Sequence, residues 1–113
     1  MFLYCKDKAV SAGEKSIIEI SNCRINNNEI GIVSKDQSIV VSKNNDLKNN
    51  RLDLAVFKKK KIYSHPTIIN HNTFFKNYLI EKKSNIEGFK NIIFASNVED
   101  KLYGNLYGIR TEK

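Results

Sequence analysis

The sequence contains little cysteine and no long apolar run. Only two cysteines occur among 113 residues, and neither a CxxC pair nor a Cys/His ligand spacing is present. A zinc site is therefore disfavoured. No segment approaches the roughly 20 apolar residues of a membrane-spanning helix. The first residues, MFLYCKDK, lack the basic region and long apolar stretch of a signal peptide.

The net charge and the length of the chain do not identify the kind of partner that it binds. The chain has 19 basic and 12 acidic residues, a formal net charge of +7, and 41% apolar residues. This length and apolar content predict one domain with a small core. A basic balance permits binding to nucleic acid, to an anionic polysaccharide or to an acidic surface, and does not choose among them.

The chain contains two adjacent copies of one pattern, residues 16–37 and 38–59. Apolar positions recur at a constant interval (38 − 16 = 22), and so do several asparagines. The matching pairs are Ile18 and Val40, Ile25 and Leu47, Ile30 and Leu52, Ile32 and Leu54, Asn22 and Asn44, Asn27 and Asn49, and Asn28 and Asn50. Self-similarity at a fixed interval indicates a stacked solenoid.

The spacing inside each copy predicts strands. Apolar residues alternate with a period of two, and the links between them are rich in asparagine, which favours turns. We therefore predict an all-β fold, a parallel β-helix with about four coils of roughly 22 residues. The expected single domain comprises a partial first coil at 1–15, coils at 16–37, 38–59 and 60–83, and a last partial coil with a C-terminal cap at 84–113.

The register predicts which side chains stack. A ladder of side-chain amides is expected along Asn28, Asn50 and Asn72, since stacked amides satisfy buried polar groups. Pro66 is expected at a turn equivalent to Asn22 and Asn44, because proline cannot donate to a ladder. The predicted apolar columns are Ile18, Val40 and Ile62; Ile25, Leu47 and Ile69; Ile30, Leu52 and Phe74; and Val10, Ile32 and Leu54.

The two cysteines do not share a column, because the spacing of Cys5 and Cys23 (23 − 5 = 18) differs from the repeat interval. Free thiols are favoured, and a disulfide remains the alternative. Residues 1–15 match only the second half of a coil. This suggests an N-terminally truncated product, another chain that caps the open first coil, or a cover formed by Phe2, Leu3 and Tyr4 of the N-terminus itself.

Three strings resemble a known type of coil: DKAVSAGEKS (7–16), IGIVSKDQS (30–38) and LAVFKKKKIYSHPTI (54–68). In this order they resemble right-handed parallel β-helix segments of bacterial envelope or secreted proteins, as found beside CotH-type kinase-like domains. The resemblance implies a right-handed β-helix and an envelope or extracellular parent protein. It implies no catalytic residues in this chain.

The repeat predicts a charged column at Glu14, Asp36 and Lys58, which is the candidate binding site. These residues could line a groove for a sugar acid or a cation, although a solvated turn with weak ion pairs explains them more simply. Residues 58–61 form a run of four lysines, but no recognition helix or RNA-binding motif accompanies it, so nucleic acid is disfavoured.

Catalytic alternatives are weaker. Asp7 and Glu29 fall in one column with Arg51, as an acid pair beside a cation could in a lyase or epimerase, but charge balance between coils explains them equally well. His65 and His71 lack partners for a metal or a catalytic triad. We predict a non-enzymatic β-helix scaffold without cofactor or metal that interacts with polysaccharide or with another protein chain. The alternative is a carbohydrate-active enzyme on the same fold.

Overall fold

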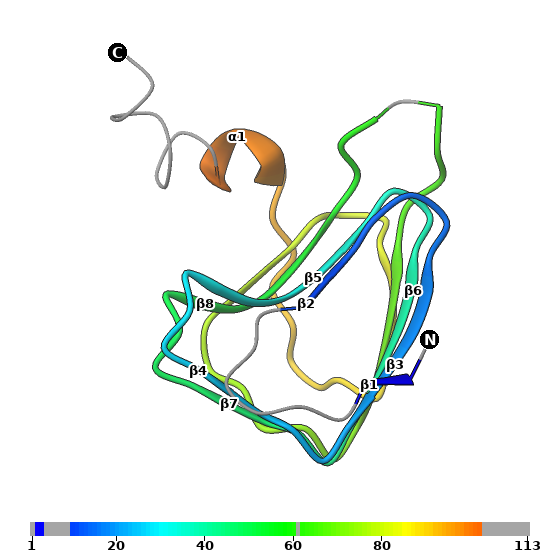
Figure 1. The fold of residues 1–113 in the computed structure, drawn as a ribbon. Helices are drawn as coiled ribbons and strands as arrows, with labels where there is room; N and C mark the ends of the chain where they lie inside the picture. Colours follow the sequence, from blue (N-terminus) through cyan, green and yellow to red (C-terminus); the bar gives the residue numbers. More distant parts are fainter. Residues whose placement is uncertain (1, 4–9, 61, 103–113) are drawn as a thin grey trace.

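The computed structural model describes residues 2–3, 10–60 and 62–102, and for 2–3 the backbone alone. Viewed along its axis, the chain winds around a triangle whose sides are three parallel sheets (Figure 1). Sheet A contains β1 (Phe2–Leu3), β3 (Ile17–Ser21), β6 (Ile39–Lys43), β9 (Thr67–His71) and β11 (Asn85–Glu87). Sheet B contains β4 (Arg24–Asn26) and β7 (Asp46–Lys48). Sheet C contains β2 (Val10–Ala12), β5 (Ile30–Lys35), β8 (Leu52–Phe57) and β10 (Tyr78–Ile80).

The molecule is thus a right-handed parallel β-helix of about four turns, as the repeat and the resemblance predicted. Its one helix within the described residues, α1 (Val98–Leu102), lies outside the triangle against sheet C (Figure 1). No helix in the described part of the chain has the length and apolar character to cross a membrane.

The constant interval of the sequence repeat holds through the first two full coils. Ile18 pairs with Val40, Ile25 with Leu47, and Ile32 with Leu54. The side chains of these strands point alternately inward and outward, so one apolar stripe of each strand meets the stripe above it. The resulting interior core comprises Val10, Ala12, Ile18, Ile20, Cys23, Ile25, Ile32, Val40, Leu47, Leu54, Val56, Ile68 and Ile80.

The third coil does not follow this interval, and the prediction that Ile62 continues the first column is wrong. Val40 pairs with Ile68 (68 − 40 = 28), and Ile62 is 83% exposed. The excess over the repeat interval (28 − 22 = 6) lies between β8 and β9. Here the chain leaves the coil as a loop, which the structure describes at residues 58–60 and 62–66 and which we call the 58–66 loop (Figure 1). Only the fourth column, Val10, Ile32 and Leu54, has all its predicted members paired.

The longer loop moves the other predicted third-coil residues as well. Ile69 pairs with Val41 on sheet A rather than continuing the column of Leu47. Phe74 bridges Asp46 and is 67% exposed, so it does not stack on Leu52. Pro66 precedes β9 in the position of Ser38, because Thr67 donates to the Ser38 carbonyl just as Asn85 donates to that of Pro66.

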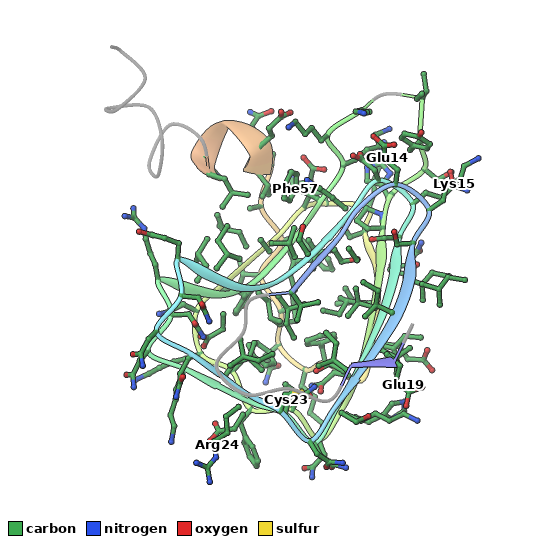
Figure 2. The ribbon with its side chains drawn as sticks, in the orientation of Figure 1. Glu14, Lys15, Glu19, Cys23, Arg24 and Phe57 are labelled. Carbon is green, nitrogen blue, oxygen red and sulfur yellow. The ribbon has the colours of Figure 1, made fainter. Side chains whose placement is uncertain are left out.

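Ile30 and Leu52 do stack, but they lie on the outer side of sheet C. They pack with Val33 against a second, smaller core whose buried members are Ala55, Phe57, Val98 and Leu102. Figure 2 shows Phe57 on the side of the sheet that faces α1. The helix therefore covers an apolar outer face that the strand alternation alone would leave in solvent.

Asparagines form two of the three corners of the triangle. Asn22, Asn44 and Asn72 have φ values of 55°, 53° and 62°, and Asn27 and Asn49 have 60° and 59°. This left-handed conformation turns the chain sharply, and asparagine tolerates it better than most residues. Asn72 therefore belongs to the corner of Asn22 and Asn44, and its side chain donates to Asn44 Oδ1 at 3.0 Å. The predicted ladder of side-chain amides along Asn28, Asn50 and Asn72 is accordingly wrong: Asn72 lies at another corner, and the Asn28 amide donates to the Asn26 carbonyl rather than to Asn50.

Two buried asparagines, Asn45 and Asn50, join the second coil to the first. Asn45 Oδ1 accepts the Cys23 N–H at 2.8 Å, and Asn45 Nδ2 donates to the Ile20 carbonyl at 2.9 Å. Asn50 repeats the arrangement with the Asn28 N–H and the Ile25 carbonyl. The amides therefore satisfy backbone groups of the coil below rather than one another.

We expect Asn45→Ala to destabilise the protein by about 2–4 kcal/mol, because it removes the buried hydrogen bonds of Asn45 to the Cys23 N–H and to the Ile20 carbonyl. Urea unfolding followed by circular dichroism measures this as a lower midpoint. The exposed Asn77→Ala serves as control and should change the free energy of unfolding by less than about 0.5 kcal/mol. Equal midpoints for the two variants would contradict the role assigned to Asn45.

Candidate functional site

The third corner, between sheets C and A, is built from three equivalent turns. Ser16, Ser38 and Ser84 each donate their N–H to the carbonyl three residues earlier, on Gly13, Lys35 and Glu81. The residue before each serine has a positive φ, 58° at Lys15, 64° at Gln37 and 74° at Lys83. These are β-turns whose third residue is left-handed. Most of the central side chains of these turns face solvent, on Glu14, Lys15, Gln37, Lys82 and Lys83, whereas that of Asp36 is buried.

Charged side chains stack along this corner. Ala12, Ser34, Val56 and Ile80 are paired in successive strands, so the residues two positions further on, Glu14, Asp36, Lys58 and Lys82, fall in one column. Neighbouring coils lie about 4.8 Å apart. We call the set of lysines here the lysine corner: Lys15, Lys35, Lys58, Lys59, Lys60, Lys82 and Lys83.

Asp36 is the structural centre of the corner. It is 1% exposed, and its Oδ1 accepts the backbone N–H groups of Lys59 at 2.7 Å and Lys60 at 2.9 Å. The Asp36 carbonyl accepts the Lys15 N–H from the coil below. Hydrogen bonds from backbone N–H groups to a carboxylate are stronger than neutral ones. Asp36 therefore anchors the base of the 58–66 loop and is not open to a ligand.

Glu14 holds the same loop from its exposed side. Its carboxylate binds the Lys60 ammonium and accepts a hydrogen bond from the Tyr63 hydroxyl at 3.4 Å. The Lys15 ammonium lies 5.8 Å from the centre of the Tyr63 ring, and Ser64 donates its N–H to Gln37 Oε1 at 3.3 Å. Figure 2 shows Glu14 and Lys15 beneath this loop.

The ion pair shifts the acidities of both partners. The hydrogen bond from Lys60, reinforced by its charge, lowers the pKa of Glu14 below its ordinary value of 4.5. The same bond raises the pKa of Lys60 above 10.5. The pair therefore stabilises the loop above the unfolded pKa of Glu14 and below that of Lys60, and is lost as pH falls through the lowered value or rises through the raised one.

The third carboxylate of the corner, on Glu81, is also occupied. Glu81 Oε1 accepts the backbone N–H of Lys58 at 2.9 Å. The three carboxylates of the corner are thus held by the loop, while the ammonium groups of Lys15, Lys82 and Lys83 belong to exposed residues. Seven lysines and three carboxylates give the described part of this corner a net charge of +4.

The predicted residues Glu14, Asp36 and Lys58 follow three paired strands of sheet C. Glu14 and Asp36 hold the 58–66 loop, and Lys58 is the first residue of that loop. Sequence reasoning missed Lys82 and Lys83, because counting the repeat interval onward from Lys58 (58 + 22 = 80) ends at Ile80. The turn strings GEKS (13–16), KDQS (35–38) and EKKS (81–84) carried the signal, since each ends on the serine that closes the turn.

The other candidate groups stay apart or lie outside the described residues. Glu29 and Arg51 are exposed at a turn, and Asp7, their expected neighbour, is not described. In the part of the chain that the structure covers, no three His, Cys, Asp or Glu residues gather as a metal site would require. Cys23 is buried and its Sγ donates to the Ser21 carbonyl, and Cys5 lies outside the described residues.

Comparison with known proteins does not assign the chain to a family. No family model matches the chain, and neither curated proteins nor solved structures include a significant match.

We expect Asp36→Asn to speed tryptic cleavage within the 58–66 loop by about tenfold, because the amide replaces a charged acceptor of two backbone N–H groups. Timed digestion with mass spectrometry measures the rate and the cleavage sites. Asp46→Asn, which removes a surface ion pair with Lys48, is the matched control and should leave the rate unchanged. Cleavage at the wild-type rate in Asp36→Asn would refute the anchor.

The acidity of Glu14 provides an independent measurement. Carbon-detected NMR titration should place its pKa below the ordinary value in the wild type and raise it in Lys60→Gln, because the hydrogen bond and charge of Lys60 are the main causes of the lowering. A Glu14 pKa that does not respond to Lys60→Gln would show that the pair is not formed.

Proposed function

We propose that this β-helix is a non-enzymatic scaffold that binds acidic polysaccharide along the lysine corner. The observation that supports the proposal is that the carboxylates of this corner have partners in the loop, whereas several of its lysines are exposed. The loop occupies the carboxylates of Glu14, Asp36 and Glu81 with hydrogen bonds and an ion pair, whereas exposed lysines remain on the same edge. A surface of this kind attracts a polyanion over a range of about 10 Å at 0.1 M salt.

The shape of the corner favours an extended ligand. Lys58 and Lys82 stack in one column, and Lys15 and Lys83 occupy equivalent places in the neighbouring column. Both columns run along the axis of the solenoid, with about 4.8 Å between coils. A linear chain that carries a charge on regularly spaced units can contact several lysines at once, which multiplies weak single contacts.

An envelope or secreted parent protein, implied by the resemblance of the three coil strings, fits a polysaccharide ligand and remains part of the proposal. Another protein chain that caps the N-terminal coil is a second partner the sequence predicts. A carbohydrate-active enzyme on the same fold is the alternative function. Of the residues that hypothesis needs, Glu29 and Arg51 are exposed rather than enclosed around a substrate, so the scaffold has the stronger support.

We expect the double variant Lys82→Gln and Lys83→Gln to bind an acidic polysaccharide such as hyaluronan about tenfold more weakly than the wild type, because two charge-assisted contacts are lost. Affinity electrophoresis and titration calorimetry at several salt concentrations measure the change. The control variant, Lys48→Gln with Lys90→Gln, removes the same charge from exposed residues away from the corner and should retain wild-type affinity.

Three outcomes would overturn the proposal. The first is absence of wild-type binding at low salt, and the second is equal loss in both double variants. The third is release of reducing ends from the polysaccharide, which would favour the enzyme. Tighter binding to single-stranded DNA than to polysaccharide would instead identify a nucleic-acid ligand.

A further inference from the structure

An open pocket of about 470 Å³ lies next to the lysine corner. Its lining comes from β10, from the segment that follows β11, and from α1. That segment is joined to the chain just after β10 by an isolated parallel bridge between Ala95 and Glu81, in which Ala95 donates to the Ile80 carbonyl at 2.9 Å and accepts the Lys82 N–H at 2.8 Å. The Tyr78 hydroxyl accepts the Ile93 N–H at 3.1 Å and fixes the start of the same segment. The walls are therefore tied by backbone hydrogen bonds.

The charged residues that line the pocket are positive. Lys82 and Lys101 both line it, and no carboxylate does among the described residues. Lys82 comes from the turn that follows β10 and Lys101 from α1, so the two lysines line the pocket from separate segments. An anion placed between them would gain from both charges. Among the described residues, the other polar side chains in the lining are the hydroxyls of Tyr78 and Ser96.

Apolar side chains make up the rest of the lining. Leu79 and Ala95 pack against the second core, and Ile93 and Phe94 are 79% and 39% exposed. Two large apolar side chains exposed side by side at a concave surface are typical of a ligand site. The aromatic ring of Phe94 provides a flat apolar face on which one sugar ring can pack.

We propose that this pocket binds the carboxylate-bearing ring of a terminal uronic acid unit of the polysaccharide. The carboxylate lies between Lys82 and Lys101, the apolar face of the sugar ring packs on Phe94, and Ser96 hydrogen-bonds a sugar hydroxyl. A volume of about 470 Å³ accommodates one such unit with water around it. A neutral sugar would leave both lysines without a counter-charge, so the site selects the acid.

Lys82 connects the pocket with the proposed function. The residue belongs both to the charged column of the lysine corner and to the pocket lining. A chain that follows the column from Lys58 to Lys82 would bring its end unit to the pocket. The inference thus rests on the proposed function and adds an end-specific site to it.

The test uses Lys101→Gln and Phe94→Ala, neither of which changes the lysine corner. Trisaccharides of the hyaluronan repeat with glucuronate at the non-reducing end are titrated into the full chain, and chemical-shift changes and calorimetry report binding. We expect each variant to weaken the trisaccharide about three- to tenfold, and the signals of Ser96 and Lys101 to shift in the wild type. Lys48→Gln is the matched control and should behave as wild type. Unchanged circular dichroism confirms the fold of each variant.

The outcomes separate the two proposals. If hyaluronan binds and depends on Lys82 and Lys83, while Lys101→Gln and Phe94→Ala bind the trisaccharide like wild type, the pocket inference is overturned and the proposed function stands. Equal affinity for a trisaccharide that ends in a neutral sugar would also overturn the pocket inference. If hyaluronan does not bind but the glucuronate-ended trisaccharide shifts Ser96 and depends on Lys101, the proposed function falls and the pocket assignment stands.

Discussion

The parallel pairing of each coil with the coil beneath it determines most of this structure. A single coil of three short strands has an apolar inner face that it cannot bury alone, so the core forms only where Ile18 meets Val40 and Ile32 meets Leu54. The same pairing places every outward side chain above its equivalent. Core, corners and charged columns are therefore consequences of one register, and a change in loop length between two strands moves all the residues that come after it.

Buried polar groups inside the solenoid also form their hydrogen bonds between neighbouring coils. Asn45 and Asn50 each form hydrogen bonds with an N–H and a carbonyl of the coil below, near the corners of the triangle. Asp53 links the second coil to the third in the same way, because its carboxylate accepts the Lys76 N–H at 2.7 Å. Buried polar side chains thus specify the register that the aliphatic columns alone would leave tolerant of slippage.

The lysine corner derives from the one place where the chain leaves the repeat. The 58–66 loop needs acceptors for its backbone N–H groups, and Asp36 and Glu81 provide them. Glu14 pairs with Lys60 on the surface. The carboxylates of the corner therefore bind groups of the loop, and the exposed lysines give the surface a net positive charge. Lys82 belongs both to this surface and to the pocket lining. Architecture and the proposed polyanion binding therefore have one physical origin, the fixing of an inserted loop at a charged turn.

The sequence by itself determined the β-helix, the pairing of the first two coils and the column of Glu14, Asp36 and Lys58, because these depend on side chains that recur at a constant interval. Tertiary structure decided the path of the chain after Phe57. The extra loop residues carry no periodic signal of their own, and the later coils have different lengths, so Ile68, Pro66 and Asn72 took places that counting assigned to other residues. It also decided that Asp36 is buried and that Lys82 and Lys101 line one pocket, since burial and the meeting of a strand end with a helix depend on packing between segments distant in the chain.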